Sequence, residues 1–315
     1  MNFTPGASNE TEAVNYLDTL LMAVGSNVTV VVLGITINYI NATMVHTFNK
    51  HHIFKVNTRY ILFIHLVVND MIQLTISISL FIFTYTFRTI YVSICCLFIL
   101  PAIFTTQNTP LNLAFMACYI AVCIPLRYNY ICTVKRTYIV IGIIWAMSSL
   151  SVLPDIFILL ATEPLEFLNS RVYCLRDSVF RSTYSLKKRD ASHILFLVVV
   201  WLTLFYTYFR IFFAAKAADA DAKKARNTIL LHGFQVLLCM TVYVQPMLLQ
   251  LLTYLFPDFR FINFSIFIIN QILPRFVSPI VYGLRDKTFR KYFKQYLLCT
   301  GAVNIHQNTT LKIPS

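Results

Sequence analysis

Charged residues are scarce in this sequence, and their scarcity excludes an ordinary soluble domain. Only 12% of the 315 residues are charged, whereas 57% are hydrophobic; soluble domains carry roughly twice that share of charge. Each helical crossing of a bilayer takes about 20 mostly apolar residues. A chain of this length therefore has room for several membrane crossings joined by short loops, and little is left for a second domain.

Glycine and converging reactive side chains are also scarce. The chain has 7 glycines and no internal repeat, whereas channels and transporters usually show broken helices with paired glycines, a charged pore ring or repeated halves. The apolar stretches hold no set of His and carboxylate ligands at one depth and no nucleophile beside a base. We therefore expect no metal, no cofactor and no enzyme activity, and a channel or transporter is kept only as an alternative.

Seven long apolar stretches are present instead. They lack the alternating pattern of barrel strands, and a backbone within lipid must satisfy its own hydrogen bonds, so each stretch is expected to be a helix. After the seventh, aromatic and basic residues recur at helical spacing, which predicts a short amphipathic helix on the anionic inner leaflet of the lipid bilayer. The sequence thus predicts an all-α membrane protein, a seven-transmembrane helix bundle with a short amphipathic eighth helix, in a single domain over residues 1–298. The predicted spans are 20–45, 59–83, 91–123, 138–161, 191–215, 227–252 and 261–284, the amphipathic helix is 285–298, and residues 299–315 are a cytosolic tail.

The positions of Lys and Arg predict how the chain is oriented. Most of the 26 basic residues lie in the tail and in the loops after the first, third and fifth spans, and such loops stay in the cytosol. We therefore expect a multi-pass protein of the plasma membrane with an extracellular amino terminus, a cytosolic carboxyl terminus and an uncleaved first span. The same asymmetry accounts for most of the formal charge of +13, so no nucleic-acid partner is needed to explain it. Two sequons in the outer terminus, at Asn2 and Asn9, are expected to carry glycans.

The eight cysteines divide by the compartment that each one faces. Cys95 and Cys96 begin the third span on the outer side, and Cys174 lies in the long loop from Thr162 to Asp190. Because disulfides form in the oxidising outer compartment, we expect Cys174 to pair with Cys95 or Cys96. Three free thiols are the alternative.

Two faces of the predicted spans have the composition of a ligand pocket. One is a stripe at helical spacing in the outer half of the third span, and the other is a polar and soft face in the outer half of the sixth. Such faces suit a small-molecule pocket better than lipid, although packing alone also produces the first stripe. Beside the stripe, Asn108 and Thr109 are expected to form hydrogen bonds between helices. The predicted ligand-binding residues are Ile99, Ala102, Ile103 and Thr106 in the third span and Tyr243, Met247 and Gln250 in the sixth.

Four phrases in the sequence carry a resemblance to a known family. They are NTRYILFIHLVVND at 57–70, FMACYIAVCIPLRY at 115–128, KKARNTILLH at 223–232 and SPIVYGLRDKTFRKYF at 278–293. In this order, in the second, third, sixth and seventh spans, they resemble the odorant receptors, in their fish-type branch, of the rhodopsin-like (class A) G-protein-coupled receptors. The resemblance implies a chemosensory receptor that binds a small-molecule odorant from the extracellular side. It also implies that the receptor activates a heterotrimeric G protein of the olfactory stimulatory type, which raises cyclic AMP.

The resemblance also places coupling residues at the cytosolic ends of the spans. Where the family has an acid followed by an arginine, this chain has Ala117 and Cys118, which offer neither a salt bridge nor a cation to the G protein. Coupling is then expected to use the other groups at that end, and a receptor-like protein with weak or absent coupling is the alternative. The predicted coupling residues are Cys118, Tyr119, Arg127, Lys223, Lys224 and Tyr282.

A second unusual feature lies deep in the seventh span, where Arg275 precedes Pro279 by four residues. A cation at that depth is costly unless it has a partner. In receptors that this chain resembles, an aspartate matching Asp70 faces the seventh span and commonly binds a sodium ion. We expect the guanidinium of Arg275 to replace that ion and to bridge Asp70, with Gln107 and Ser278 completing its hydrogen bonds. The alternative is an Arg275 side chain that extends into a water-filled ligand cavity beside a neutral Asp70.

Overall fold

The structure is a computed structural model that describes residues 6–87, 89–126, 133–217, 264–277 and 287–297. Long helices, short helices and two short strands make up this part of the chain. The long helices are α1 (Gly6–Lys50), α3 (Thr58–Thr86), α4 (Val92–Leu126), α5 (Val134–Thr162) and α8 (Thr183–Ala217), and the short ones are α2 (His52–Lys55), α6 (Leu165–Leu168), α7 (Arg176–Val179) and α12 (Lys287–Leu297). The strands are β1 (Ile90–Tyr91) and β2 (Arg171–Val172), and a further apolar helix, Phe264–Val277, contains the π-helical segment η1 (Ile268–Ile272).

Five of the described helices, α1, α3, α4, α5 and α8, are long and apolar enough to cross a bilayer. They confirm the predicted bundle of membrane helices in this part of the chain. Two of them begin well before the predicted spans, α1 at Gly6 and α8 at Thr183. The charged start of α8 stays helical because its side chains pair with neighbouring elements, as described below. The predicted span 227–252 lies outside the described residues, and the predicted seventh span is represented by Phe264–Val277.

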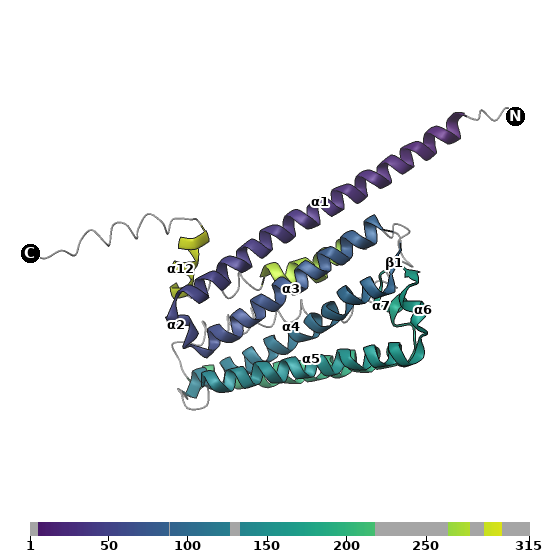
Figure 1. The fold of residues 1–315 in the computed structure, drawn as a ribbon. Coiled ribbons are helices and arrows are strands. Elements are labelled where there is room, and N and C mark those ends of the chain that lie inside the picture. The colour runs from purple at the N-terminus through teal and green to yellow at the C-terminus, as the bar shows by residue number, and fades with distance from the viewer. Residues whose placement is uncertain (1–5, 88, 127–132, 218–263, 278–286, 298–315) are drawn as a thin grey trace, which may run out of the picture.

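The long helices lie side by side, with α4 near the centre (Figure 1). α4 packs against α3, α5 and α8, and α1 packs against α3. Leu66, Leu111, Ile144 and Val200, one from each of α3, α4, α5 and α8, are buried together. Large apolar side chains on the outer faces stay exposed, as expected for helices that meet lipid.

The helix α12 lies at one end of the bundle (Figure 1), where aromatic side chains attach it. Phe289 and Phe293 of α12 are buried, and the Phe289 ring centre lies 5.2 Å from that of Phe54 in α2 and 5.9 Å from that of Tyr60 in α3. This face fixes α12 to the bundle, and the basic face stays exposed. The exposed basic residues of α12 are Lys287, Arg290, Lys291 and Lys294.

The opposite end carries a folded loop that connects α5 to α8. Its strand β2 pairs antiparallel with β1, with Ile90 opposite Val172, and β1 lies at this end of the molecule (Figure 1). A disulfide joins Cys174 of the loop to Cys95 of α4, with Cα atoms 5.5 Å apart. The loop therefore forms a fixed layer over this end of the described helices.

Candidate functional site

A layer of buried polar side chains lies between α3 and α4. Asn69 donates through Nδ2 to the carbonyl of Thr105 at 3.1 Å and to Oγ1 of Thr109 at 2.8 Å. One turn farther along α3, Gln73 donates to Oγ1 of Thr106 at 2.7 Å, and its Oε1 lies 3.2 Å from the Thr109 hydroxyl. Because a bilayer offers no water to unpaired groups, these bonds hold the two helices in one register. The predicted helix-to-helix bond of Thr109 is confirmed.

A second hydrogen-bonded group, which sequence reasoning missed, joins α3, α4 and α5. Trp145 donates through Nε1 to Nε2 of His65 at 2.6 Å, and Nδ1 of His65 lies 2.8 Å from Oδ1 of Asn112. Since Nε2 accepts, the proton of the neutral ring is on Nδ1 and is donated to Asn112. Asn108 accepts from Asn112 of its own helix at 2.7 Å, and it makes no bond to another helix among the described residues. The sequence signal was the recurrence of polar residues every four positions from His65 to Gln73, which marks one face of α3.

Asp70 and Arg275 are both buried, each with 2% of the residue exposed. The hydroxyl of Thr109 lies 3.5 Å from Oδ1 of Asp70. The helix that carries Arg275 meets α3 where Oγ of Ser77 donates to Oε1 of Gln271 at 3.3 Å. The two charged residues thus belong to neighbouring elements, and the bridge between them stays a prediction.

The other two members of the predicted network are placed only in part. Gln107 is buried in α4, and its Oε1 has no hydrogen-bond partner within the described part of the chain. Ser278 lies outside the described residues. Their predicted contacts with Arg275 therefore stay predictions.

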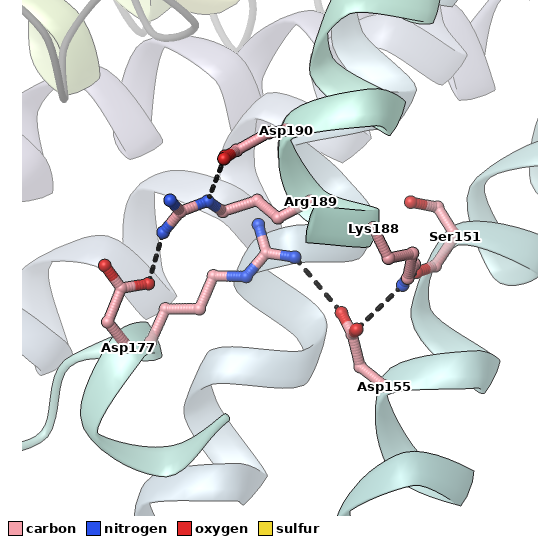
Figure 2. A network of polar contacts seen from close by, with 7 residues as sticks. Ser151, Asp155, Asp177, Lys188, Arg189 and Asp190 are labelled. Atoms are coloured by element: carbon pink, nitrogen blue, oxygen red, sulfur yellow. Dashed lines mark hydrogen bonds and ion pairs between the residues drawn. The ribbon is translucent and has the colours of Figure 1, made fainter. Parts of the chain in front are cut away.

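A cluster of charged side chains joins α5, α7 and α8 at the end that carries the disulfide (Figure 2). Asp155 of α5 is fully buried; its Oδ2 accepts from Arg176 of α7 at 3.1 Å, and its Oδ1 lies 2.8 Å from Nζ of Lys188 in α8. Lys188 also donates to the carbonyl of Ser151. Burial lowers the pKa of the Arg176 guanidinium, and the charge of Asp155 opposes that effect. Two cations around one buried carboxylate thus hold the three elements together.

Arg189 of α8 extends this cluster toward the solvent. It pairs with Asp177 of α7 and, at 2.9 Å, with its neighbour Asp190 (Figure 2). Three nearby loop residues are therefore tied to three different long helices, Cys174 to α4, Arg176 to α5 and Asp177 to α8. Such a loop is held in one place relative to all three helices.

The structure divides the predicted ligand-binding stripe of α4 between two neighbours. Ile99 and Ile103 are buried in an apolar cluster formed with α5 and the loop after it. Thr106 accepts a hydrogen bond from α3, and Ala102 is half-buried. The pocket itself stays a prediction, because its other predicted residues lie outside the described part, namely Tyr243, Met247 and Gln250.

The predicted coupling and glycosylation residues fall largely outside the described part. Cys118 and Tyr119 belong to the last turns of α4, and Asn9 belongs to the first turns of α1, but their side chains are not among those described. The remaining predicted residues, Arg127, Lys223, Lys224, Tyr282 and Asn2, lie outside the described residues entirely. All of these roles stay predictions.

The order and character of these helices match a known family. The family model described as 7 transmembrane receptor (rhodopsin family) matches residues 21–282, a range that includes most of α1, the four other long helices and the fixed loop. The chain belongs to the rhodopsin family of seven-transmembrane receptors. It is also 34% identical, over 279 residues, to a zebrafish (Danio rerio) protein named Odorant receptor 131-2, and the aligned part covers 85% of this chain and 84% of that relative. The protein is therefore a multi-pass membrane receptor.

The disulfide of this receptor decides between the two cysteines that the sequence left open. The bond joins Cys174 to Cys95, and the described Cys96 is free and half-buried. Successive residues of a helix point about 100° apart, so only one of two neighbouring cysteines can face the loop. The prediction of a bridge to Cys174 is confirmed, and the alternative of three free thiols is wrong.

Replacing Lys188 with glutamine should lower the thermal stability of the receptor by a moderate amount. Because Asp155 keeps Arg176 as a counter-ion, we expect a loss of about 1.5–3 kcal/mol, the value of a hydrogen bond to a charged group. Arg181→Gln is the matched control, since Arg181 pairs with Glu163 at the same end while 56% of its side chain is exposed. The control should lower the melting temperature less than Lys188→Gln does, because an ion pair exposed to solvent adds little stability. Equal melting temperatures of the two purified variants would contradict the role given to Lys188.

Proposed function

We propose that this protein is a chemosensory G-protein-coupled receptor, which binds a small odorant-like molecule from the extracellular side and activates a heterotrimeric G protein. The observation that carries the proposal is the similarity to an odorant receptor along 85% of the chain. The resemblance of the coupling phrases implies a G protein of the olfactory stimulatory type, with cyclic AMP as the messenger.

The proposed orientation places the amino terminus outside the plasma membrane and the carboxyl terminus in the cytosol. The disulfide between Cys95 and Cys174 needs an oxidising compartment, which supports an extracellular location of that end. The helix α12 lies at the opposite end (Figure 1), and its exposed basic residues are of the kind that anionic lipids of the inner leaflet attract. Both ends thus support the orientation expected from the distribution of Lys and Arg.

The proposed ligand acts by shifting a population between two arrangements of the helices. Thr106 belongs to the proposed pocket, and it also accepts from Gln73 in the polar layer between α3 and α4. The layer continues through Thr109 to Asp70. A ligand that contacts Thr106 therefore perturbs the hydrogen bonds that set the register of these two helices, which is a physical route from the pocket toward the inner half.

The proposal is tested by expressing the receptor together with an olfactory stimulatory G protein and screening odorant mixtures. The expected result is a ligand-dependent rise in cyclic AMP that is absent from cells without the receptor. An odorant-evoked ion current that persists without the G protein would support the channel alternative instead.

A receptor with weak or absent coupling is the second candidate function. It is favoured by Ala117 and Cys118, which stand where the family has an acid and an arginine. The discriminating measurement is ligand binding without a cyclic AMP response at normal surface expression.

Replacing Cys118 with arginine should increase the cyclic AMP response several-fold. An arginine offers five donors and a fixed charge at the end of α4, where a thiol offers one weak donor. The measurement is the maximal response to one odorant at matched surface expression, with Cys118→Met as a control for a longer side chain without charge. An unchanged or smaller response of Cys118→Arg would overturn the assignment of this position to coupling.

A further inference from the structure

The helix from Phe264 to Val277 departs from α-helical geometry at one place. Its segment Ile268–Ile272 is π-helical, and the N–H of Leu273 donates to the carbonyl of Ile268, five residues earlier. Such bulges are rare and need a local cause. A candidate cause lies next to the bulge, where Pro274 follows Leu273.

Pro274 removes a backbone donor from this part of the helix. In an α-helix the N–H of residue 274 would donate to the carbonyl of Asn270, and proline has no N–H. Asn270 and Pro274 are both buried, in a helix that belongs to the seventh predicted span. No bulk water reaches a carbonyl at such a depth, so another donor has to replace the missing one.

The side chain next to the proline is placed to supply that donor. Nη1 of Arg275 lies 2.5 Å from the carbonyl oxygen of Asn270 and 2.9 Å from that of Gln271. Arginine side chains in helices lean toward the amino-terminal turn, and a guanidinium has five donors in a planar fork. One group can therefore bond both carbonyls and still keep donors for an anionic partner.

We propose that Arg275 is a positioning residue that replaces the hydrogen-bond donor removed by Pro274 and thereby fixes the bulge in the seventh span. The bulge sets the rotation of the residues around it, because a π-turn has one residue more than an α-turn. Among these residues, Gln271 accepts from Ser77 of α3 and Asn270 is buried. Arg275 thus determines how the polar side chains of this span meet α3, a role that goes beyond ligand binding or coupling.

The test is a double-mutant cycle with Pro274→Ala and Arg275→Met in the full-length receptor. Alanine at 274 restores a backbone N–H for the Asn270 carbonyl, and methionine at 275 keeps a flexible unbranched side chain without any donor. Arg275→Met should lower the melting temperature of the detergent-purified receptor, and the fall should be clearly smaller in the Pro274→Ala background. Arg275→Met leaves Asp70 without a cation whether residue 274 is proline or alanine. Any cost of this therefore cancels from the coupling energy between the two positions.

Two further variants sharpen the cycle. Pro154 of α5 is another proline within a helix. Pro154→Ala should give no rescue of Arg275→Met, because a backbone N–H restored at 154 bonds within α5 and not to the Asn270 carbonyl. Arg275→Lys keeps a charge and three donors, so it should lose less than Arg275→Met. Additive effects of Pro274→Ala and Arg275→Met would overturn the proposal.

Surface expression covers the case in which Arg275→Met is too unstable to purify. Recovery of the receptor at the cell surface by the added Pro274→Ala then supports the proposal, and failure to recover overturns it. Both readouts are independent of the ligand and of the G protein, so they also hold if the receptor does not couple.

Discussion

Replacing Cys174 with serine should remove most of the receptor from the cell surface and abolish its response to ligand. The disulfide to Cys95 closes a sequence separation of 79 residues, and loss of such a bond typically costs about 2–5 kcal/mol. The loss also weakens two ion pairs of the same loop. Arg176 and Asp177 lie close to Cys174 in the chain and pair with residues of α5 and α8. A loop freed from α4 no longer holds these charges beside their partners.

The two neighbouring cysteines of α4 provide the matched controls. Cys95→Ser should match Cys174→Ser, and the double change should be no worse than either, because all three variants lack the same bond. Cys96→Ser keeps the bond and should stay close to the unmodified receptor. Surface labelling of intact cells measures all four variants, and either a fully active Cys174→Ser or a Cys96→Ser as damaged as Cys95→Ser would refute the assignment.

The bundle could be predicted from sequence because the length of an apolar stretch is itself a structural quantity. Stretches such as 59–83 and 138–161 have to be helices in lipid, and α3 and α5 lie there. The composition of a stretch does not determine how its helix is rotated about its own axis. For this reason the compartment argument found the bridge to Cys174, but the choice between Cys95 and Cys96 needed the structure.

The charge cluster around Asp155 was missed for a related reason. In the sequence, Asp155 is an isolated acid within a span, and Arg176 and Lys188 belong to a loop with many basic residues. The three come together only because the loop folds back and α8 starts at Thr183, so that Lys188 lies on a helix beside α5. No spacing rule connects residues from three segments. A buried acid near the outer end of a span was nevertheless a signal, since such a charge requires a partner.

Removing either Asp70 or Arg275 should damage the folding of the receptor severely, by about 3–5 kcal/mol, if the two form the proposed bridge. Both side chains are buried, and the helix of Arg275 packs on α3, which carries Asp70. The carbonyls of Asn270 and Gln271 accept from Arg275, but carbonyls carry only partial charge. A full cation at this depth still favours a carboxylate partner.

The bridge is tested by comparing Asp70→Asn, Arg275→Gln and the double variant. Each single change strands the opposite charge, whereas the double change strands neither, so the double variant should recover part of the lost surface expression and thermal stability. Because the guanidinium takes the place of an ion, the melting temperature and the signal of the unmodified receptor should not change when sodium is replaced by a bulky organic cation.

In the competing arrangement, Arg275 reaches a water-filled cavity beside a neutral Asp70. That arrangement predicts that Asp70→Asn has a mild effect on stability and that the double variant recovers nothing. A double variant no better than the worse single one, or a melting temperature that clearly depends on sodium, would decide against the bridge. The coupling between Pro274 and Arg275 is measured separately, by the cycle of Pro274→Ala and Arg275→Met.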